Sequence, residues 1–220
     1  MEQALVTRGL NKNYGDLAAL VDLDLTVEAG VVFGFLGPNG AGKTTAIRVF
    51  MDEIRSSSGS ASILGHDVHQ DSVALHRKVG YLPSDLALYP NMTGTDLLQF
   101  FANLRGGVDS QYVNALSERL DAQMSKKIGD LSSGNRQKIG IIQAFMSNPE
   151  FVILDEPSAG LDPLIQRELQ ALMRETADAG GTVFLSSHTL SEVQRVADRV
   201  GIIRNGKLIA QESIASLRAT

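Results

Sequence analysis

The chain has 220 residues, 43% of them hydrophobic, which suits one domain with a sizeable core or one domain plus a subdomain. Its 25 acidic and 20 basic residues give a formal charge of −5, which argues against a surface that coats nucleic acid. The absence of cysteine excludes disulfides and thiolate metal sites. The chain begins without signal-peptide features, and no stretch reaches the roughly 18 apolar residues that span a bilayer. We therefore expect a soluble, cytosolic protein, with any membrane part supplied by another chain.

The N-terminal part of the chain, residues 4–36, has the patterns of β-structure. Residues 20–27 alternate apolar and polar side chains over most of their length, which predicts a half-buried strand. Tyr14 lies in this part, and its ring can stack on adenine; the alternative is an ordinary half-buried strand residue. Residues 31–36 form a short apolar run of the buried-strand type.

A glycine-rich loop follows this run and matches the pattern G-x-x-x-x-G-K-[ST]. The loop consists of Gly37, Pro38, Asn39, Gly40, Ala41, Gly42, Lys43, Thr44 and Thr45. It lies between a predicted strand and a segment that can open a helix, which favours a phosphate-binding loop over an ordinary turn. Backbone N–H groups and the helix N-terminus then form an anion site. We expect Lys43 to reach the outer phosphates and the Thr44 hydroxyl to ligate Mg²⁺.

The middle of the chain changes from strand to helix. Residues 61–64 and 79–82 predict short strands, whereas about 93–147 show helical spacing of apolar side chains. Within this part, the run from Leu131 to Asn135 precedes a helix, and its serine and glycine backbone offers a second anion site; the alternative is a plain helix cap. Two phosphate sites in one domain make sense if the second serves a partner copy related by a two-fold axis.

Two carboxylates end the next predicted strand. The apolar run 151–154 leads directly into Asp155 and Glu156, and carboxylates at the carboxyl end of such a strand face the ligand crevice of an open α/β sheet. Asp155 suits a Mg²⁺ partner acting through water, and Glu156 suits the general base that polarises the attacking water. The alternative is an acidic pair that caps a helix.

The last third of the chain again alternates helix and strand. Asp162 and Pro163 predict a helix start, residues 182–186 predict a strand, and His188 follows that strand. A histidine at this place can hydrogen-bond the γ-phosphate and sense its loss, the alternative being a structural role. Residues 207–210 resemble a final strand.

The alternation predicts the fold class. We expect an α/β P-loop NTPase core with a mostly parallel sheet, an N-terminal antiparallel β layer and a helical insertion. A single domain would span residues 1–220, with the core at about 1–85 and 148–220 and the helical subdomain at about 86–147.

In their order and spacing, these motifs resemble the ATP-binding subunit of ABC transporters over essentially the whole chain. Residues 131–135 resemble the family's LSGGQ signature in a divergent form, and residues 158–162 resemble its D-loop. Tyr14 lies at the place of the adenine-stacking aromatic, and His188 at the place of the switch histidine. The variants are most similar to the bacterial branch that exports drugs, antibiotics or polyketides.

The resemblance implies an ATPase that binds ATP and Mg²⁺, dimerises on ATP and drives a permease from the inner face of the membrane. Ser132, Ser133 and Gly134 of one copy would then cover the ATP held by the other copy's P-loop. Glu156, His188 and Lys43 would carry catalysis. A groove near residues 84–96 would receive a short cytoplasmic helix of the permease.

One departure from the family pattern concerns the metal. The family has Gln or Glu at position 84, where this chain has Ser84, followed by Asp85. A serine hydroxyl does not span the distance that a Gln amide spans, so Ser84 would act through an extra water or Asp85 would replace it. The remaining alternative is that position 84 contributes little to the metal.

Three rival functions fit the sequence less well. A soluble ABC-type ATPase acting on DNA or ribosomes usually has long insertions, whereas Lys43 and Asp155 are here only 112 residues apart (155 − 43). A nucleotide-gated regulatory subunit without hydrolysis is disfavoured by Glu156 and His188. A P-loop kinase leaves residues 132–134 unexplained, and we expect no nucleic-acid partner.

Overall fold

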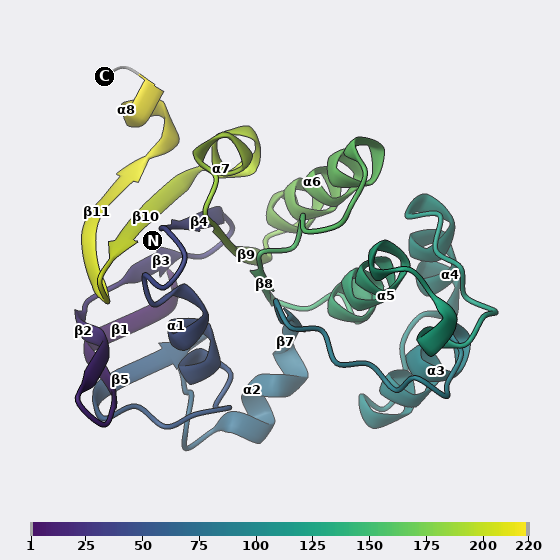
Figure 1. Cartoon of the computed structure of the whole chain (residues 1–220), viewed down its shortest axis with the longest axis horizontal. Helices are drawn as coiled ribbons and strands as arrows, with labels where there is room; N and C mark the ends of the chain where they lie inside the picture. The colour runs from purple at the N-terminus through teal and green to yellow at the C-terminus, as the bar shows by residue number, and fades with distance from the viewer. Residues whose placement is uncertain (1, 219–220) are drawn as a thin grey trace.

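The computed structural model describes residues 2–218 as two β-sheets with helices packed around them (Figure 1). The first sheet is antiparallel, with strand order β2-β1-β5-β6 and β3 paired to β1. Its strands are β1 (Gln3–Tyr14), β2 (Leu17–Leu23), β3 (Thr26–Glu28), β5 (Ser58–Ile63) and β6 (His66–Asp67). This sheet confirms the predicted antiparallel N-terminal layer.

The second sheet has six strands in the order β11-β10-β4-β9-β8-β7 and is parallel except between β10 and β11. Its strands are β4 (Val32–Leu36), β7 (Val79–Leu82), β8 (Phe151–Asp155), β9 (Thr182–Ser187), β10 (Arg199–Arg204) and β11 (Lys207–Ser213). Every residue of β8 and β9 is buried, as expected of parallel strands covered on both faces. The mostly parallel sheet of the predicted P-loop NTPase fold is confirmed.

Each face of the parallel sheet has its own apolar core, because successive strand residues point to opposite sides. Phe151 and Ile153 of β8 belong to the core shared with the antiparallel sheet and α1 (Lys43–Phe50). Phe184 lies at the centre of that core, where the rings of Phe33, Phe35 and Phe50 approach it with centroids 5.3 to 5.8 Å away.

The opposite face packs against three helices. Val152 and Leu154 of β8 point into this second core, which the helices on that side complete. These helices are α5 (Ser133–Phe145), α6 (Pro163–Asp178) and α7 (Leu190–Val196). Asp162 caps α6 by accepting from the backbone N–H groups of Leu164 and Ile165, as its sequence position predicts.

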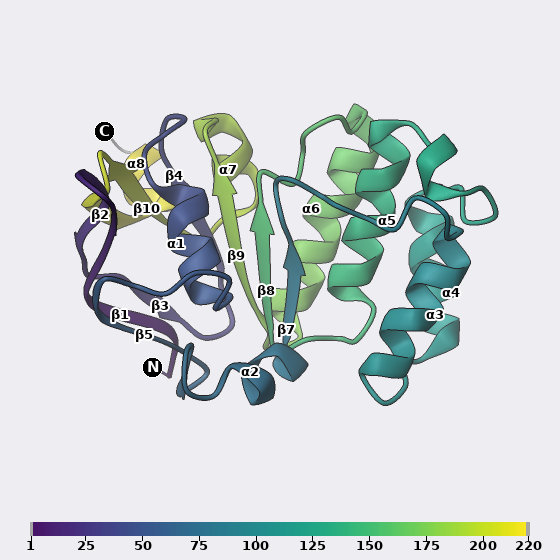
Figure 2. The same cartoon turned by 60° about the horizontal axis from the view of Figure 1, so that its bottom comes forward.

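Helices gather at one end of the molecule, at the right of Figures 1 and 2. They are α3 (Gly94–Leu104), α4 (Ser110–Arg119) and α5, with a short 3₁₀ turn η1 (Ile128–Asp130) between α4 and α5. Two further helices lie elsewhere, α2 (Ser72–Lys78) before β7 and α8 (Ile214–Arg218) after β11. Within residues 2–218, no helix combines the length and apolar character that crossing a membrane requires.

The predicted single strand over residues 20–27 is wrong. The chain forms β2 and β3 instead, which pair with different parts of the long strand β1, Leu23 beside Leu10 and Thr26 beside Val6. Between them, the Asp24 carboxylate accepts a hydrogen bond from the Gly9 backbone N–H at 2.6 Å. The pairing partner, rather than the local alternation, decides where each strand ends.

Candidate functional site

The carboxyl ends of four neighbouring parallel strands meet at one edge of the sheet. Figure 2 shows β7, β8 and β9 running side by side in the same direction toward this edge, with α1 beside them. The P-loop follows β4, Ser84 follows β7, Glu156 follows β8 and His188 follows β9. In open α/β sheets, ligands bind at this edge.

The P-loop positions the N-terminus of α1 at the site. Gly42 precedes the helix with φ 109°, and no side chain of the described residues caps the first turn, so the backbone N–H groups of that turn remain available to an anion. A Cβ atom at Gly42 would lie 2.7 Å from the carbonyl oxygen of Ala19, and one at Gly37 would lie 2.5 Å from that of Ile203. Close backbone packing therefore requires glycine at both positions.

Lys43 is buried within the loop, with 5% of the residue exposed. Its Nζ atom donates to the carbonyl oxygens of Gly37 at 2.7 Å and Pro38 at 3.4 Å. The same atom lies 3.2 Å from Oε1 of Glu156. The loop's cation thus faces the carboxylate that follows β8.

Glu156 has an unusual backbone conformation and two ionisable side chains next to its carboxylate. Its φ of 51° lies in the left-handed region that side chains other than glycine seldom adopt. Its Oε2 atom lies 2.8 Å from Nδ1 of His188, so Glu156 connects Lys43 on one side with His188 on the other. Strained backbones of this kind cluster at functional sites.

Asp155 lies fully buried beneath Glu156. Its Oδ1 atom accepts a hydrogen bond from the Ser186 hydroxyl, whereas its Oδ2 atom has no hydrogen-bond partner among the described residues. An unpaired oxygen on a buried carboxylate is costly unless a cation compensates it. The site therefore fits a metal ion, and carboxylate and hydroxyl oxygens suit Mg²⁺, which keeps several waters.

A cavity of about 630 Å³ adjoins the loop. Of the predicted site residues, it is lined by Tyr14, Asn39–Thr45, Ser84 and Glu156. Tyr14 is half exposed, with Lys12 Nζ 5.0 Å from the ring centroid. Asp85 is exposed but does not line the cavity, so of the two residues considered for the metal only Ser84 borders the P-loop cavity.

Ser132, Ser133 and Gly134 do not line this cavity. They form the start of α5, where the Ser132 hydroxyl accepts from the Asn135 backbone N–H at 3.3 Å. Gly134 packs against the D-loop, because a Cβ atom there would lie 2.8 Å from the Gly160 carbonyl oxygen. The signature thus belongs to one packed unit with the D-loop and lies apart from the P-loop of its own chain.

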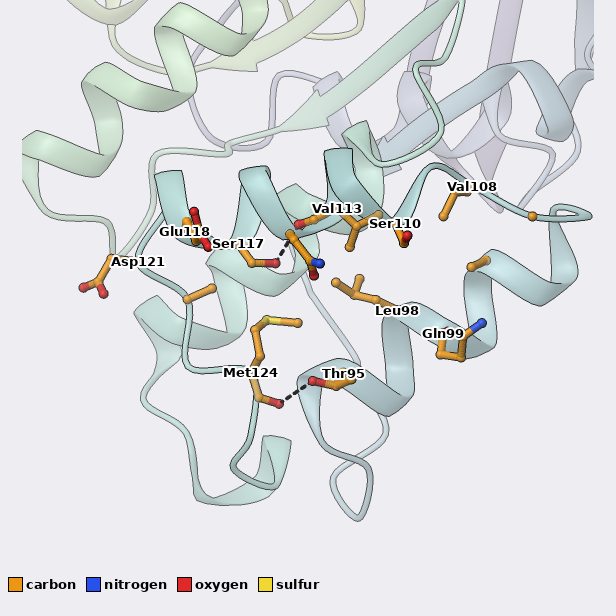
Figure 3. Close-up of a pocket in the computed structure, with 14 residues that line it drawn as sticks. Thr95, Leu98, Gln99, Val108, Ser110, Val113, Ser117, Glu118, Asp121 and Met124 are labelled. Atoms are coloured by element: carbon orange, nitrogen blue, oxygen red, sulfur yellow. Dashed lines mark hydrogen bonds between the residues drawn. The ribbon is translucent and has the colours of Figure 1, made fainter.

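A second hollow, of about 770 Å³, lies between α3 and α4 (Figure 3). Its charged lining residues are Glu118 and Asp121, and within residues 2–218 no Lys or Arg lines it. Leu98, Val113 and Met124 supply apolar walls. An acidic hollow repels a triphosphate, so this region does not compete with the P-loop cavity as the nucleotide site.

Several residues at the site escaped the sequence-based reasoning. Asn205 and Gly206, in the turn between β10 and β11, line the P-loop cavity together with Leu17, Ala18 and Ala19. Ser186 contacts both Asp155 and Glu156. The one sequence signal for Ser186 was its position at the end of an apolar strand. Asn205 and Gly206 belong to no motif that the sequence analysis could have used.

Known proteins resemble this chain over most of its length. Residues 20–159 match the family model described as ABC transporter. The bacitracin transport ATP-binding protein BcrA of Enterococcus faecalis is 36% identical over 220 residues, covering 99% of this chain and 71% of that protein. The daunorubicin/doxorubicin resistance ATP-binding protein DrrA of Streptomyces peucetius is 32% identical, covering 99% of this chain and 68% of that protein.

Solved structures show the same fold. The structure of an ATP-binding subunit of an ABC transporter superposes with a TM-score of 0.90 at 28% identity, covering 98% of this chain and 92% of that one. A dimeric ATP-binding cassette in a post-hydrolysis state, bound to ADP and phosphate, superposes with a TM-score of 0.87 at 18% identity, covering 96% and 98%. At that identity, the second likeness concerns the fold alone.

Proposed function

This chain belongs to the ABC transporter family, and we propose that it is an ATP-hydrolysing subunit that dimerises on ATP and drives a membrane permease. Lys43 and Glu156, which face each other 3.2 Å apart beside one cavity of the P-loop, carry this proposal. They place a phosphate-binding cation next to a carboxylate able to orient water, as phosphoryl transfer to water requires.

The loop residues from Gly37 to Thr45 hold the triphosphate in this proposal. Free N–H groups at the start of α1 and the Lys43 ammonium offset phosphate charge. Tyr14, which lines the same cavity, stacks on the adenine.

The Thr44 hydroxyl, Asp155 Oδ2 through water, and Ser84 would hold Mg²⁺, with Asp85 outside the cavity as the weaker candidate. A bound Mg²⁺ would supply positive charge that offsets the negative charge developing on the transferred phosphoryl group.

Glu156 and His188 act on the reacting end of the nucleotide. In the structure Glu156 contacts Lys43 and His188. Once a γ-phosphate draws the Lys43 ammonium toward itself, the Glu156 carboxylate is released to accept a proton from the attacking water. His188, whose side chain is 56% exposed, is free to turn toward the γ-phosphate and hydrogen-bond it.

A second copy of the chain completes the site. Ser132, Ser133 and Gly134 start a helix and so offer an anion-binding N-terminus, yet they do not line their own P-loop cavity. A two-fold axis that brings the signature of one copy over the P-loop of the other would form two equivalent sites, each with one P-loop and one signature. Closure is then favourable only while ATP supplies contacts that the open state lacks.

The permease would dock on the helical subdomain. Tyr89, Phe100 and Leu104 are exposed, and the rings of Tyr89 and Phe100 lie 6.0 Å apart. This apolar patch borders the predicted groove at residues 84–96 and suits a short amphipathic helix. Docking there would hold the subunit at the inner face of the membrane and transmit closure through about residues 86–147.

The proposed cargo is a drug-like or other small molecule that is exported. The names of BcrA and DrrA refer to transport of bacitracin and to resistance to daunorubicin and doxorubicin. Both proteins cover nearly all of this chain at more than 30% identity, which supports the same class of cargo.

The test combines hydrolysis with partner capture. We expect the purified chain to hydrolyse ATP only with Mg²⁺ present, and to co-purify with a multi-span permease encoded in the neighbouring reading frame when the two are co-expressed. A chain that binds ATP without turnover would favour a nucleotide-gated regulatory subunit. Turnover stimulated by DNA or ribosomes, without permease binding, would favour the soluble ATPase.

A further inference from the structure

Ser186 lies at the carboxyl end of β9, directly opposite Asp155 in the parallel pairing of β8 and β9. It is fully buried, with 0% of the residue exposed. Buried hydroxyls in protein interiors make hydrogen bonds, and this one bonds to Asp155, the last residue of β8, and to Glu156, which follows it.

The hydroxyl connects both acidic residues. Its single proton is donated to Oδ1 of Asp155, and its oxygen accepts from the backbone N–H of Glu156 at 3.0 Å. A serine hydroxyl has one donor and two acceptor sites, so these two bonds fix its orientation. Because the proton is directed at Oδ1, the Oδ2 atom of Asp155 is the oxygen left without a hydrogen bond in the described chain.

The second bond acts on Glu156. This residue has φ 51°, a left-handed conformation that side chains other than glycine disfavour and that persists only when the surroundings hold it. The Ser186 oxygen anchors the N–H of that residue. The same conformation sends the Glu156 side chain toward Lys43 and His188.

We propose that Ser186 is a positioning residue for both the metal and the general base. One hydroxyl turns Asp155 so that Oδ2 is presented to Mg²⁺, and it holds the backbone of Glu156 so that its carboxylate faces the P-loop. This inference rests on the proposed ATPase function and assigns a role to a residue outside the recognised motifs. Residues that orient metal-binding carboxylates in this way typically affect metal affinity or activity by about 10- to 100-fold.

Ser186→Ala tests the proposal, with Ser187→Ala as a matched control. Ser187 is equally buried and adjacent on β9, but its hydroxyl donates to Glu192 at 2.6 Å rather than to Asp155. Binding of a fluorescent ATP analogue is measured with EDTA and across a Mg²⁺ titration, beside the ATPase rate. Thermal unfolding of each variant checks its fold.

For Ser186→Ala, we expect nucleotide affinity in EDTA within about twofold of wild type, half-saturating Mg²⁺ raised about tenfold, and kcat lowered by about 10- to 100-fold. Ser187→Ala should keep the wild-type Mg²⁺ dependence. Ser186→Thr keeps the hydroxyl and should recover most of the Mg²⁺ response. If Ser186→Ala does not fold, Ser186→Cys, which keeps the volume but donates weakly, should show the same Mg²⁺ defect.

A folded Ser186→Ala variant with wild-type Mg²⁺ dependence and kcat would overturn the proposal, as would an equal defect in Ser187→Ala. Absence of Mg²⁺-dependent ATP binding in the wild-type chain would instead overturn the proposed ATPase function. The two failures are therefore distinguishable in one set of measurements.

Discussion

The Nζ atom of Lys43 lies 3.2 Å from Oε1 of Glu156, which places the cation of the P-loop against the carboxylate that follows β8. The two residues come from segments far apart in the sequence, and the parallel pairing of β4 with β9 and of β9 with β8 brings them together. Lys43 is almost fully buried, so the pair is poorly screened by solvent.

Glu156→Gln removes the carboxylate charge while keeping the side-chain size. We expect ATP binding to persist and hydrolysis to fall by about 100-fold or more, because the amide cannot accept the proton of the attacking water. An ATP-dependent dimer should then be stable enough to appear in size-exclusion chromatography with light scattering. Turnover equal to wild type would remove Glu156 from its role as base.

Lys43→Ala should weaken ATP binding by about tenfold or more, because an ammonium paired with phosphate oxygens contributes about 1.5–3 kcal/mol. Fluorescent-nucleotide titration measures the change. Lys207→Ala provides a control, since Lys207 begins β11 and does not line the P-loop cavity. Unchanged affinity in Lys43→Ala would contradict the assignment of the P-loop as the phosphate site.

Substitutions at Ser84 and Asp85 test which of these two residues acts on the Mg²⁺ ion. Ser84 lines the P-loop cavity and Asp85 does not, so we expect Ser84→Ala to raise half-saturating Mg²⁺ severalfold and Asp85→Ala to leave it within about twofold. Ser84→Gln restores the family residue and should strengthen the Mg²⁺ response. A defect confined to Asp85→Ala would reverse the assignment.

The ion pair between α4 and α6 gives stability a defined pH dependence. The Arg119 guanidinium donates to both carboxylate oxygens of Glu175, at 2.7 and 2.8 Å, and holds the pKa of Glu175 below its ordinary value of 4.5. A lowered folded-state pKa stabilises the protein above the unfolded-state pKa, and this contribution is lost as the pH falls through the folded-state pKa.

Because Glu175 is largely exposed, we expect Glu175→Gln to reduce the free energy of unfolding by only about 0.5–1 kcal/mol at pH 7. The difference from wild type should disappear in acid, below the folded-state pKa of Glu175. Urea unfolding at both pH values measures it. Glu212→Gln, at an exposed position of β11, is the control. A loss of unfolding free energy in Glu175→Gln that stays constant with pH would count against the ion pair.

The sequence predicts the P-loop region well because its strand, glycine loop and helix are local in the chain. Residues 32–36 and 151–154 carry no polar side chain, and such runs are buried in a sheet that is covered on both faces. Strand ends near Asp22 and Asp24 were mispredicted because they depend on which part of β1 each segment meets.

The site was only partly predictable for the same reason. Asn205 and Gly206 reach the cavity through β10, which pairs with β4 across more than 160 residues of chain. The role of Ser186 depends on its exact register beside Asp155. Neither relationship can be detected from the periodicity or the composition of the sequence, because both depend on the order of the strands in the sheet.

The central claim is that the chain contains half of an ATP site, with residues 132–134 completing the site of a second copy. Gly134→Ala should disable the signature, since the added Cβ would lie 2.8 Å from the Gly160 carbonyl oxygen. Lys43→Ala disables the P-loop instead. In a mixed dimer, the intact P-loop of one variant faces the intact signature of the other.

The most direct measurement is therefore the ATPase rate of an equimolar mixture of the Lys43→Ala and Gly134→Ala chains, compared with each variant alone. Each variant alone should be nearly inactive. The mixture should regain up to about a quarter of the wild-type rate, because half of randomly paired dimers are mixed and each has one intact site. A mixture no more active than the average of its two components would contradict a site shared between copies.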